Sequence, residues 1–130
     1  MEDIRNSPIE ISKDDFKKIG YHLIDKIADF IDTIRDRPVT CGESPQQLQK
    51  ILGTASLPEN GVPVEELLSK TTELLFNHSL LNGHPKFLGY ITSYATPVGA
   101  LADLLAATVK PTVGAIILIP IATELDTQTM

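Results

Sequence analysis

The sequence predicts a mainly α fold, in which three helices come first and an extended connector leads to further helices. Two observations support this prediction. Apolar residues recur at spacings of three and four over most of the chain, which is the period of an amphipathic helix. Start signals precede three of these stretches, at Ser12, Ser44 and Thr96, because serine and threonine side chains cap the free N–H groups of a first helical turn.

The first predicted helix starts after Ser12 and ends before Pro38. Residues 12–15 resemble a capping box in which aspartate takes the place of glutamate or glutamine. The positions that follow form an apolar stripe: Phe16, Ile19, Leu23, Ile27, Phe30, Ile31 and Ile34. Tyr21 and Ile24 widen this stripe, so we expect the helix to need partners on more than one side.

The second and third helices are predicted from equally local signals. Ser44, Pro45 and Gln47 supply an N-cap, a proline at the first helical position and a capping glutamine, and Gly53 closes this short helix. The third helix is expected over about 63–77. Its apolar face contains Val64, Leu67, Leu68, Thr71, Leu74 and Leu75.

The remainder of the chain combines a connector with two further elements. Phe87 to Tyr94 fits neither the helical nor the strand period, so it is predicted to be extended or irregular. Thr96-Pro97 starts a helix that continues through Val109. Residues 114–120 are apolar on both alternating faces and are expected to be buried on both sides. Residues 121–130 resemble the first turns of a helix, so the chain is expected to stop inside this element.

Composition excludes several classes of function. A formal charge of −6 and a pI of 4.9 argue against a nucleic-acid partner, because affinity for nucleic acids depends mostly on basic groups. The longest nearly uncharged apolar stretch, 111–122, is shorter than the roughly 20 residues that a membrane-spanning helix needs. The single cysteine, Cys41, and the absence of a leader favour a cytoplasmic protein.

The residues alone identify no catalytic site. The histidines His22, His78 and His84 are dispersed, and no cysteine pair accompanies them, so no metal site is predicted. Glu124 and Asp126 are two residues apart, which on a helix points them away from each other. The chain contains no nucleophile elbow, no dinucleotide-binding glycine motif and no Walker loop.

The densest group of unusual residues is the stretch 84–93, followed by the capped helix start at 95–103. Loops of this kind often bind ligands. The alternative is a connector whose Phe87 and Tyr90 only fill a helical core. The sequence pattern leaves both interpretations open.

These stretches carry a resemblance to a known family. The chain contains His84-Pro85-x-Phe87-x-Gly89-Tyr90, then 100–105 (ALADLL), then 113–115 (VGA), and then Pro120-x-Ala122-Thr123-Glu124-Leu125. In this order and spacing they resemble the early part of group II pyridoxal-phosphate-dependent decarboxylases, which include aromatic-amino-acid, tyrosine, tryptophan and histidine decarboxylases. The resemblance extends from about Phe16 to Met130 and is nearly residue by residue from His84 onward.

The resemblance implies a fold and an assembly. The chain would be the N-terminal helical segment of a transferase-like (fold type I) decarboxylase, truncated before the α/β cofactor domain. Residues 1–83 would form a helical dimerisation segment of a homodimer. Residues 84–130 would contain the substrate loop and the start of the large cofactor domain.

The resemblance also implies substrate-binding residues for an amino acid, with aromatic amino acids as the expected class. One loop lines the substrate pocket with Tyr90, Ile91, Thr92 and Ser93, and Ser93 matches a substrate-contacting threonine of the animal aromatic enzymes. A second loop, with Thr112 and Gly114, reaches the active site of the neighbouring subunit. Gly114 stands where the animal aromatic enzymes carry phenylalanine, which leaves the preferred amino acid open.

The same resemblance implies that this chain is inactive alone. The family's chemistry needs a lysine that forms a Schiff base with pyridoxal 5'-phosphate, an aspartate and a stacking histidine, and in the family all three lie beyond the length of this chain. None of the lysines here follows a histidine in the family's pattern. We therefore expect no catalytic or cofactor-binding residue in this chain and no bound cofactor. The alternative function is a stand-alone, non-catalytic helical self-association module.

Overall fold

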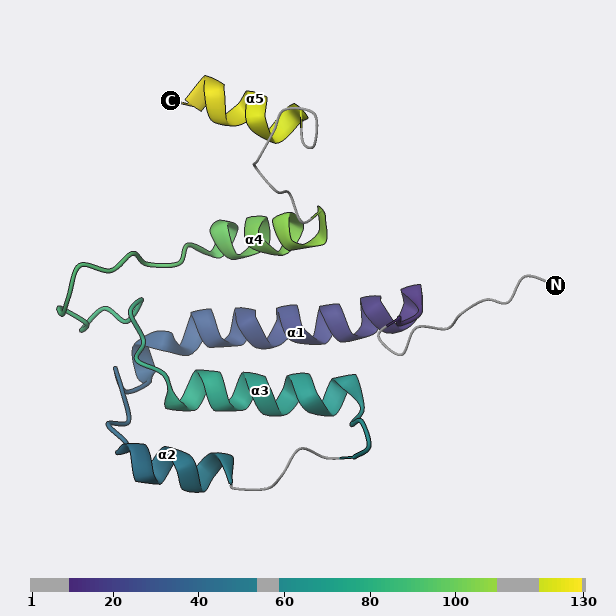
Figure 1. The fold of residues 1–130 in the computed structure, drawn as a ribbon. Coiled ribbons are helices and arrows are strands. Elements are labelled where there is room, and N and C mark those ends of the chain that lie inside the picture. The colour runs from purple at the N-terminus through teal and green to yellow at the C-terminus, as the bar shows by residue number, and fades with distance from the viewer. Residues whose placement is uncertain (1–9, 54–58, 110–119, 130) are drawn as a thin grey trace. The chain divides into compact units, whose positions relative to one another are not determined.

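The computed structural model describes residues 10–53, 59–109 and 120–129, and all regular structure within them is helical. The chain divides into two compact units, Met1–Thr92 and Ser93–Met130. The first unit contains α1 (Lys13–Thr33), α2 (Pro45–Leu52) and α3 (Val64–His78), and the second contains α4 (Pro97–Val109) and α5 (Pro120–Thr129) (Figure 1). The predicted mainly α fold is confirmed for the described residues.

Helix α1 spans Lys13–Thr33 and continues as a short 3-10 helix, Ile34–Asp36. The Asp15 backbone N–H donates to Ser12 Oγ at 3.1 Å, and the Ser12 hydroxyl donates to the Asp15 carboxylate at 2.6 Å. The predicted cap is therefore confirmed. The predicted end before Pro38 is also confirmed, because helical structure stops at Asp36.

Helix α2 spans Pro45–Leu52 and has both predicted ends. The Gln47 N–H donates to Ser44 Oγ at 3.3 Å, and the Ser44 N–H donates to Gln47 Oε1 at 2.8 Å, which completes a reciprocal capping box. At the other end Gly53 adopts a φ of 79°. This left-handed conformation favours glycine because it has no Cβ.

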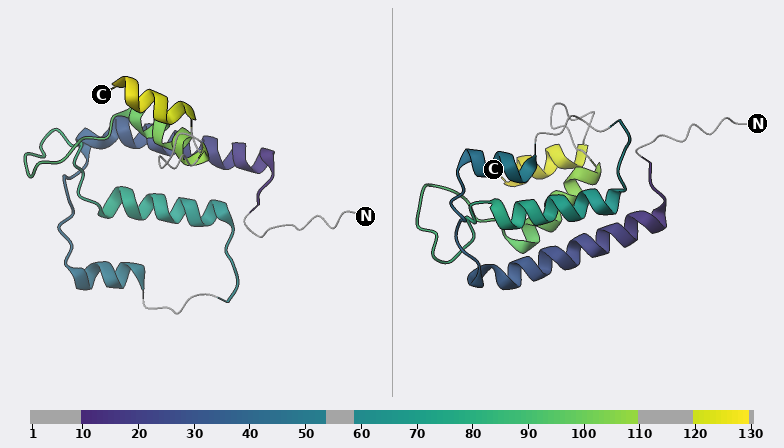
Figure 2. Two further views of the ribbon diagram at one scale, coloured as in Figure 1. Left: turned by 45° about the horizontal axis from the view of Figure 1, so that its top comes forward. Right: turned by 90° about the horizontal axis from the view of Figure 1, so that it is seen from below.

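Helix α3 spans Val64–His78 and lies beside α1, running in the same direction (Figure 1). All views place α3 between α1 and α2, and α2 runs the opposite way (Figure 2). Three contacts follow the α1–α3 seam in order: Lys18 with Glu65 at 3.7 Å, Lys26 Nζ with Ser69 Oγ at 2.9 Å, and the Phe30 ring with the Phe76 ring at 4.1 Å between centroids. The α1–α3 pair is the main packing interaction that the described residues show.

Burial in the first unit is sparse. Ile19, Leu81, Thr72 and His84 are its buried residues among those described. The predicted stripe of α1 is half-buried from Leu23 to Ile34, whereas Phe16 is 58% exposed. Such a thin core indicates that the apolar surface of this unit is only partly covered by its own helices.

The predicted apolar face of α3 meets α1 only along one edge, where the half-buried Leu68 lines a small hollow together with Ile19 and Leu23 of α1. Helix α3 presents Ser69, Thr72 and Phe76 to α1. Leu67 and Leu75 stay 52% and 58% exposed. The packed side is centred on one ring stack and polar contacts, so these two leucines stay outside, whereas Leu68 and Leu74 are half-buried.

The second unit contains α4, Pro97–Val109, and α5, Pro120–Thr129. Thr96 Oγ1 accepts the Gly99 N–H at 3.0 Å, so the predicted start of α4 is confirmed. None of the residues of α4 is buried. Helix α5 confirms the helix predicted over 121–130 as far as Thr129. The two-sided burial predicted for 114–120 lies outside the described residues except for Pro120, which is exposed.

Candidate functional site

A pair of tight turns leads from α3 into the predicted substrate loop. The Leu81 N–H donates to the Val39 carbonyl at 2.8 Å, which fastens the first turn to the segment after α1. The His84 N–H then donates to the Leu81 carbonyl at 2.9 Å, and the Phe87 N–H donates to the His84 carbonyl at 2.9 Å. Three successive backbone hydrogen bonds therefore link Phe87 to His84, His84 to Leu81, and Leu81 to Val39.

The His84 side chain is buried inside these turns, with only 4% of the residue exposed. Its Nδ1 accepts the Lys86 backbone N–H at 3.0 Å. In a neutral imidazole this acceptor role leaves the proton on Nε2. Nε2 is buried and has no hydrogen-bond partner among the described residues. A buried donor left without an acceptor costs about 1–3 kcal/mol, so the position of this ring is maintained by the rest of the turn.

The turn ends in an aromatic pair at the loop itself. The Phe87 and Tyr90 rings lie 6.5 Å apart between centroids, tilted by 35°. A Cβ added at Gly89 would lie 3.3 Å from the Phe87 ring, closer than ordinary contact, so glycine allows the ring to fold back against the backbone. Tyr90 has a φ of 56°, a left-handed conformation that costs roughly 1–2 kcal/mol in a residue with a Cβ.

The predicted substrate residues that the structure describes are exposed. Tyr90 is 88% exposed and Ile91 fully so, and Thr92 completes the first unit. Ser93, also exposed, opens the second unit, while Thr112 and Gly114 lie outside the described residues. The tip of the loop therefore exposes the phenol of Tyr90 and the apolar side chain of Ile91. A role of these residues in substrate binding stays a prediction.

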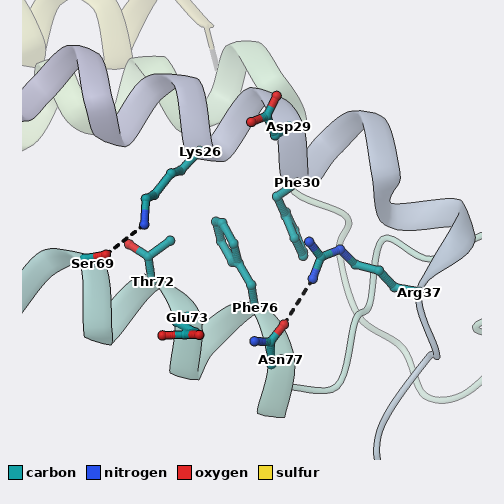
Figure 3. A pocket seen from close by; sticks show the side chains of 9 residues that line it. All are labelled: Lys26, Asp29, Phe30, Arg37, Ser69, Thr72, Glu73, Phe76 and Asn77. Carbon is teal, nitrogen blue, oxygen red and sulfur yellow. Dashed lines mark hydrogen bonds between the residues drawn. The ribbon is translucent and has the colours of Figure 1, made fainter.

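A hollow of about 390 Å³ lies between α1 and α3 (Figure 3). It is lined by Lys26, Asp29, Phe30, Arg37, Ser69, Thr72, Glu73, Phe76 and Asn77. The Arg37 guanidinium lies 5.0 Å from the Phe30 ring centroid and donates to Asn77 Oδ1 at 3.3 Å. The sequence analysis missed Phe76 because it followed the leucine-rich face of this helix. The signal that could have found it is a phenylalanine four residues after Thr72, on the stripe beside the leucine-rich face.

This hollow does not fit pyridoxal phosphate. The amine of Lys26 is held by Ser69 Oγ. The hollow lies toward the C-terminal ends of both helices and includes the carboxylates of Asp29 and Glu73. Helix C-termini and carboxylates repel a phosphate, which binds instead at helix N-termini. We therefore derive no catalytic step through a cofactor from these residues.

A second cluster fastens the segment after α1 to the end of α3. The Cys41 thiol donates to the Asn77 carbonyl at 3.0 Å, and Glu43 Oε1 lies 2.6 Å from His78 Nδ1. The hydrogen bond from His78, followed by a backbone hydrogen bond, lowers the pKa of the Glu43 carboxyl from its ordinary 4.5. Sequence spacing could not reveal this pair, because its members are separated by 35 positions.

In the described part of the chain, no three histidine, cysteine, aspartate or glutamate side chains are arranged to hold a metal ion. None of the helices in this part combines the length and apolar character that crossing a membrane requires.

Comparison with known proteins identifies two curated relatives. The chain is 31% identical over 99 residues, or 76% of its length, to the aromatic-L-amino-acid decarboxylase of Bacillus atrophaeus. It is 26% identical over 120 residues, or 92% of its length, to the phenylacetaldehyde synthase of Petunia hybrida. These matches cover 20% and 24% of the relatives, so the chain spans about a fifth to a quarter of their length. No family model and no solved structure matches the chain.

Proposed function

We propose that this chain is the N-terminal part of a pyridoxal-phosphate-dependent decarboxylase that removes carbon dioxide from aromatic amino acids. It contributes a dimer interface and a substrate-binding loop, and the cofactor lysine belongs to another part of the enzyme. The observation that carries the proposal is the 31% identity to an aromatic-L-amino-acid decarboxylase over 76% of the chain. The motifs at 84–90 and 100–105 support the same assignment.

Exposed apolar side chains support a dimer through the N-terminal helices. Val64, Leu67 and Leu75 lie along one side of α3 and are 39%, 52% and 58% exposed; we name them the α3 stripe. On α1, Phe16 and Tyr21 are 58% and 68% exposed. Soluble monomers rarely leave such surface uncovered. A second copy covers a self-complementary face of this kind in a two-fold dimer.

The loop geometry supports substrate binding. Tyr90 and Ile91 are highly exposed at its tip, and a phenol beside an apolar side chain suits contact with the ring of an aromatic amino acid. Ser93 adds an exposed hydroxyl. In the assembled enzyme, Thr112 and Gly114 of one subunit would approach this loop in the other. The cofactor would supply the electron sink for carbon dioxide release, while the residues of this chain bind and orient the substrate.

A chimera tests the proposal directly. Residues 16–130 replace the corresponding segment of the Bacillus atrophaeus enzyme, and carbon dioxide release is measured with phenylalanine, tyrosine and tryptophan. The chimera is expected to be active on at least one of them. Tyr90→Ala should raise KM about tenfold, which corresponds to the loss of roughly 1.4 kcal/mol of binding. Tyr94→Ala, a second exposed tyrosine nearby in the sequence, serves as the matched control and should change KM little.

The competing function is a helical module that acts only by self-association. The exposed α3 stripe would serve that function equally well. A chimera that dimerises and binds pyridoxal phosphate yet releases no carbon dioxide from any of the three amino acids would favour this module and contradict the decarboxylase assignment.

A further inference from the structure

We propose that His84 is a positioning residue for Tyr90, because its buried ring fixes the turn that brings Phe87 against the Tyr90 ring. The inference rests on the proposed function, since it concerns the loop that would meet the substrate. It assigns a role to a histidine that the proposed chemistry leaves unused.

The turn is built around His84. The residue takes part in three hydrogen bonds: its N–H donates to Leu81, its carbonyl accepts from Phe87 and its Nδ1 accepts from Lys86. Because Leu81 is itself bonded to Val39, the turn is fastened to the segment that follows α1. These hydrogen bonds restrict the conformation of the backbone between His84 and Phe87.

The turn also determines where the Phe87 ring lies relative to Tyr90. With its backbone N–H held by His84, the half-buried Phe87 directs its ring over Gly89 and toward the Tyr90 ring, 6.5 Å away. Tyr90 adopts a left-handed φ of 56°. A residue with a Cβ remains in that conformation only where its surroundings favour it. Among the described residues, the Phe87 ring is the aromatic neighbour of Tyr90, and we infer that it favours this backbone conformation.

The buried side chain at position 84 is an imidazole, not an apolar group, and this choice has both a cost and a benefit. An apolar side chain of similar size would fill the space and leave no unpaired donor, whereas His84 leaves Nε2 buried without a partner in the described residues. Unlike an apolar side chain, the imidazole accepts a hydrogen bond from the Lys86 N–H through its other nitrogen, Nδ1. The acceptor is therefore the feature that this position requires.

The test uses the complete 130-residue chain and NMR. His84→Leu removes the acceptor, and His84→Asn retains one, because an asparagine Oδ1 can take the Lys86 N–H. We expect His84→Leu to abolish the nuclear Overhauser effect between the Phe87 and Tyr90 rings and to change the Tyr90 backbone coupling constant. We expect His84→Asn to restore both. The Phe30–Phe76 ring contact should persist in every variant.

Any one of the following results would overturn the inference. The first is a Phe87–Tyr90 contact that survives His84→Leu. The second is the equal loss of the Phe87–Tyr90 and Phe30–Phe76 contacts, which would indicate general unfolding. The third, which needs no variant, is a histidine 15N spectrum that places the His84 proton on Nδ1. Phe87→Ala provides a further check with the His84 turn intact, and unchanged Tyr90 coupling in that variant would also refute the proposal.

The chimera separates this inference from the proposed function. His84→Leu should raise KM for the aromatic substrate about tenfold with a much smaller change in kcat, and His84→Asn should restore KM. An active chimera in which His84→Leu leaves KM unchanged would refute the positioning role alone. A correctly assembled but inactive chimera would refute the proposed function, while the NMR result on the chain would still decide whether His84 positions Tyr90.

Discussion

Helices α3 and α4 have similar lengths, 15 and 13 residues, but very different surroundings. Helix α3 lies against α1 and buries Thr72, with Ser69 and Phe76 in specific contacts. Helix α4 is almost uncharged, with Asp103 as its one charged residue, yet none of its residues is buried. The more apolar helix is thus the less covered one.

Apolar character alone does not determine where a helix finds its packing partner. The contacts of α3 are specific pairs within the first unit. In α4, Val98, Leu105 and Val109 are 76%, 68% and 68% exposed, and such a helix needs cover to be stable in water. Under the proposed function, that cover belongs to the remainder of the enzyme. The α3 stripe would be covered by the second subunit.

The largest expected effect concerns the uncovered side of α3. Leu67→Glu places a charge in the α3 stripe, which disfavours burial against a second copy. We expect the dimer dissociation constant to rise about 100-fold, or roughly 2.7 kcal/mol, measured by sedimentation equilibrium. Gln49→Glu, at an exposed position of α2, adds the same single negative charge and serves as the control. Equal weakening by both variants would place the interface elsewhere.

The next effect concerns the covered side of α3. Phe76→Ala removes the ring stacked on Phe30 and should lower the free energy of unfolding by about 2 kcal/mol, less than for a fully buried phenylalanine because the ring is half-buried. Urea titration followed by circular dichroism measures the change. Leu52→Ala, on α2 and 69% exposed, should cost less than half as much. If the two variants were equally destabilised, the α1–α3 stack would not be the main source of stability.

A smaller effect compares two helix caps. Thr96→Ala removes the acceptor for the Gly99 N–H and should cost α4 about 1 kcal/mol of helix stability. Because α4 is uncovered, this loss should appear directly as fraying in NMR Cα shifts. Ser12→Ala makes the equivalent change at α1, where packing against α3 should limit the fraying to the first turn. Identical fraying would show that α4 is as well supported as α1.

The smallest effect is a dependence of stability on pH. The pKa of Glu43 is lowered from its ordinary 4.5 by His78, so its contribution to stability is present above that value. It is lost as the pH falls below 4.5 toward the lowered pKa. Glu43→Gln should therefore flatten the fall of the urea midpoint in this acidic range. A variant with the same acid profile as the unmodified chain would show that the Glu43–His78 pair contributes nothing in solution.

Sequence reasoning succeeded where a structure depends on neighbouring residues. The Ser12 and Ser44 caps, the closing Gly53 and the start at Thr96 all depend on side chains within a few positions of the backbone groups they satisfy. It failed for the pairing of Phe30 with Phe76, because both faces of α3 carry apolar residues and periodicity cannot choose between them.

For the candidate site, too, some features could be predicted from the sequence and others could not. The sequence singled out the loop around Tyr90, but it could not reveal the left-handed backbone there or the burial of His84. Both depend on how the turn folds back on Leu81 and Val39. The latter residue is distant in sequence, so no local pattern encodes the contact.

The central claim is that this chain contributes an interface and a substrate loop but not the cofactor lysine. The most direct test mixes the purified chain with pyridoxal phosphate and records its absorption spectrum together with its mass by sedimentation. We predict a dimer that dissociates with Leu67→Glu and shows no lysine-dependent cofactor band. A monomer, or a band that disappears when one particular lysine is replaced, would contradict the claim.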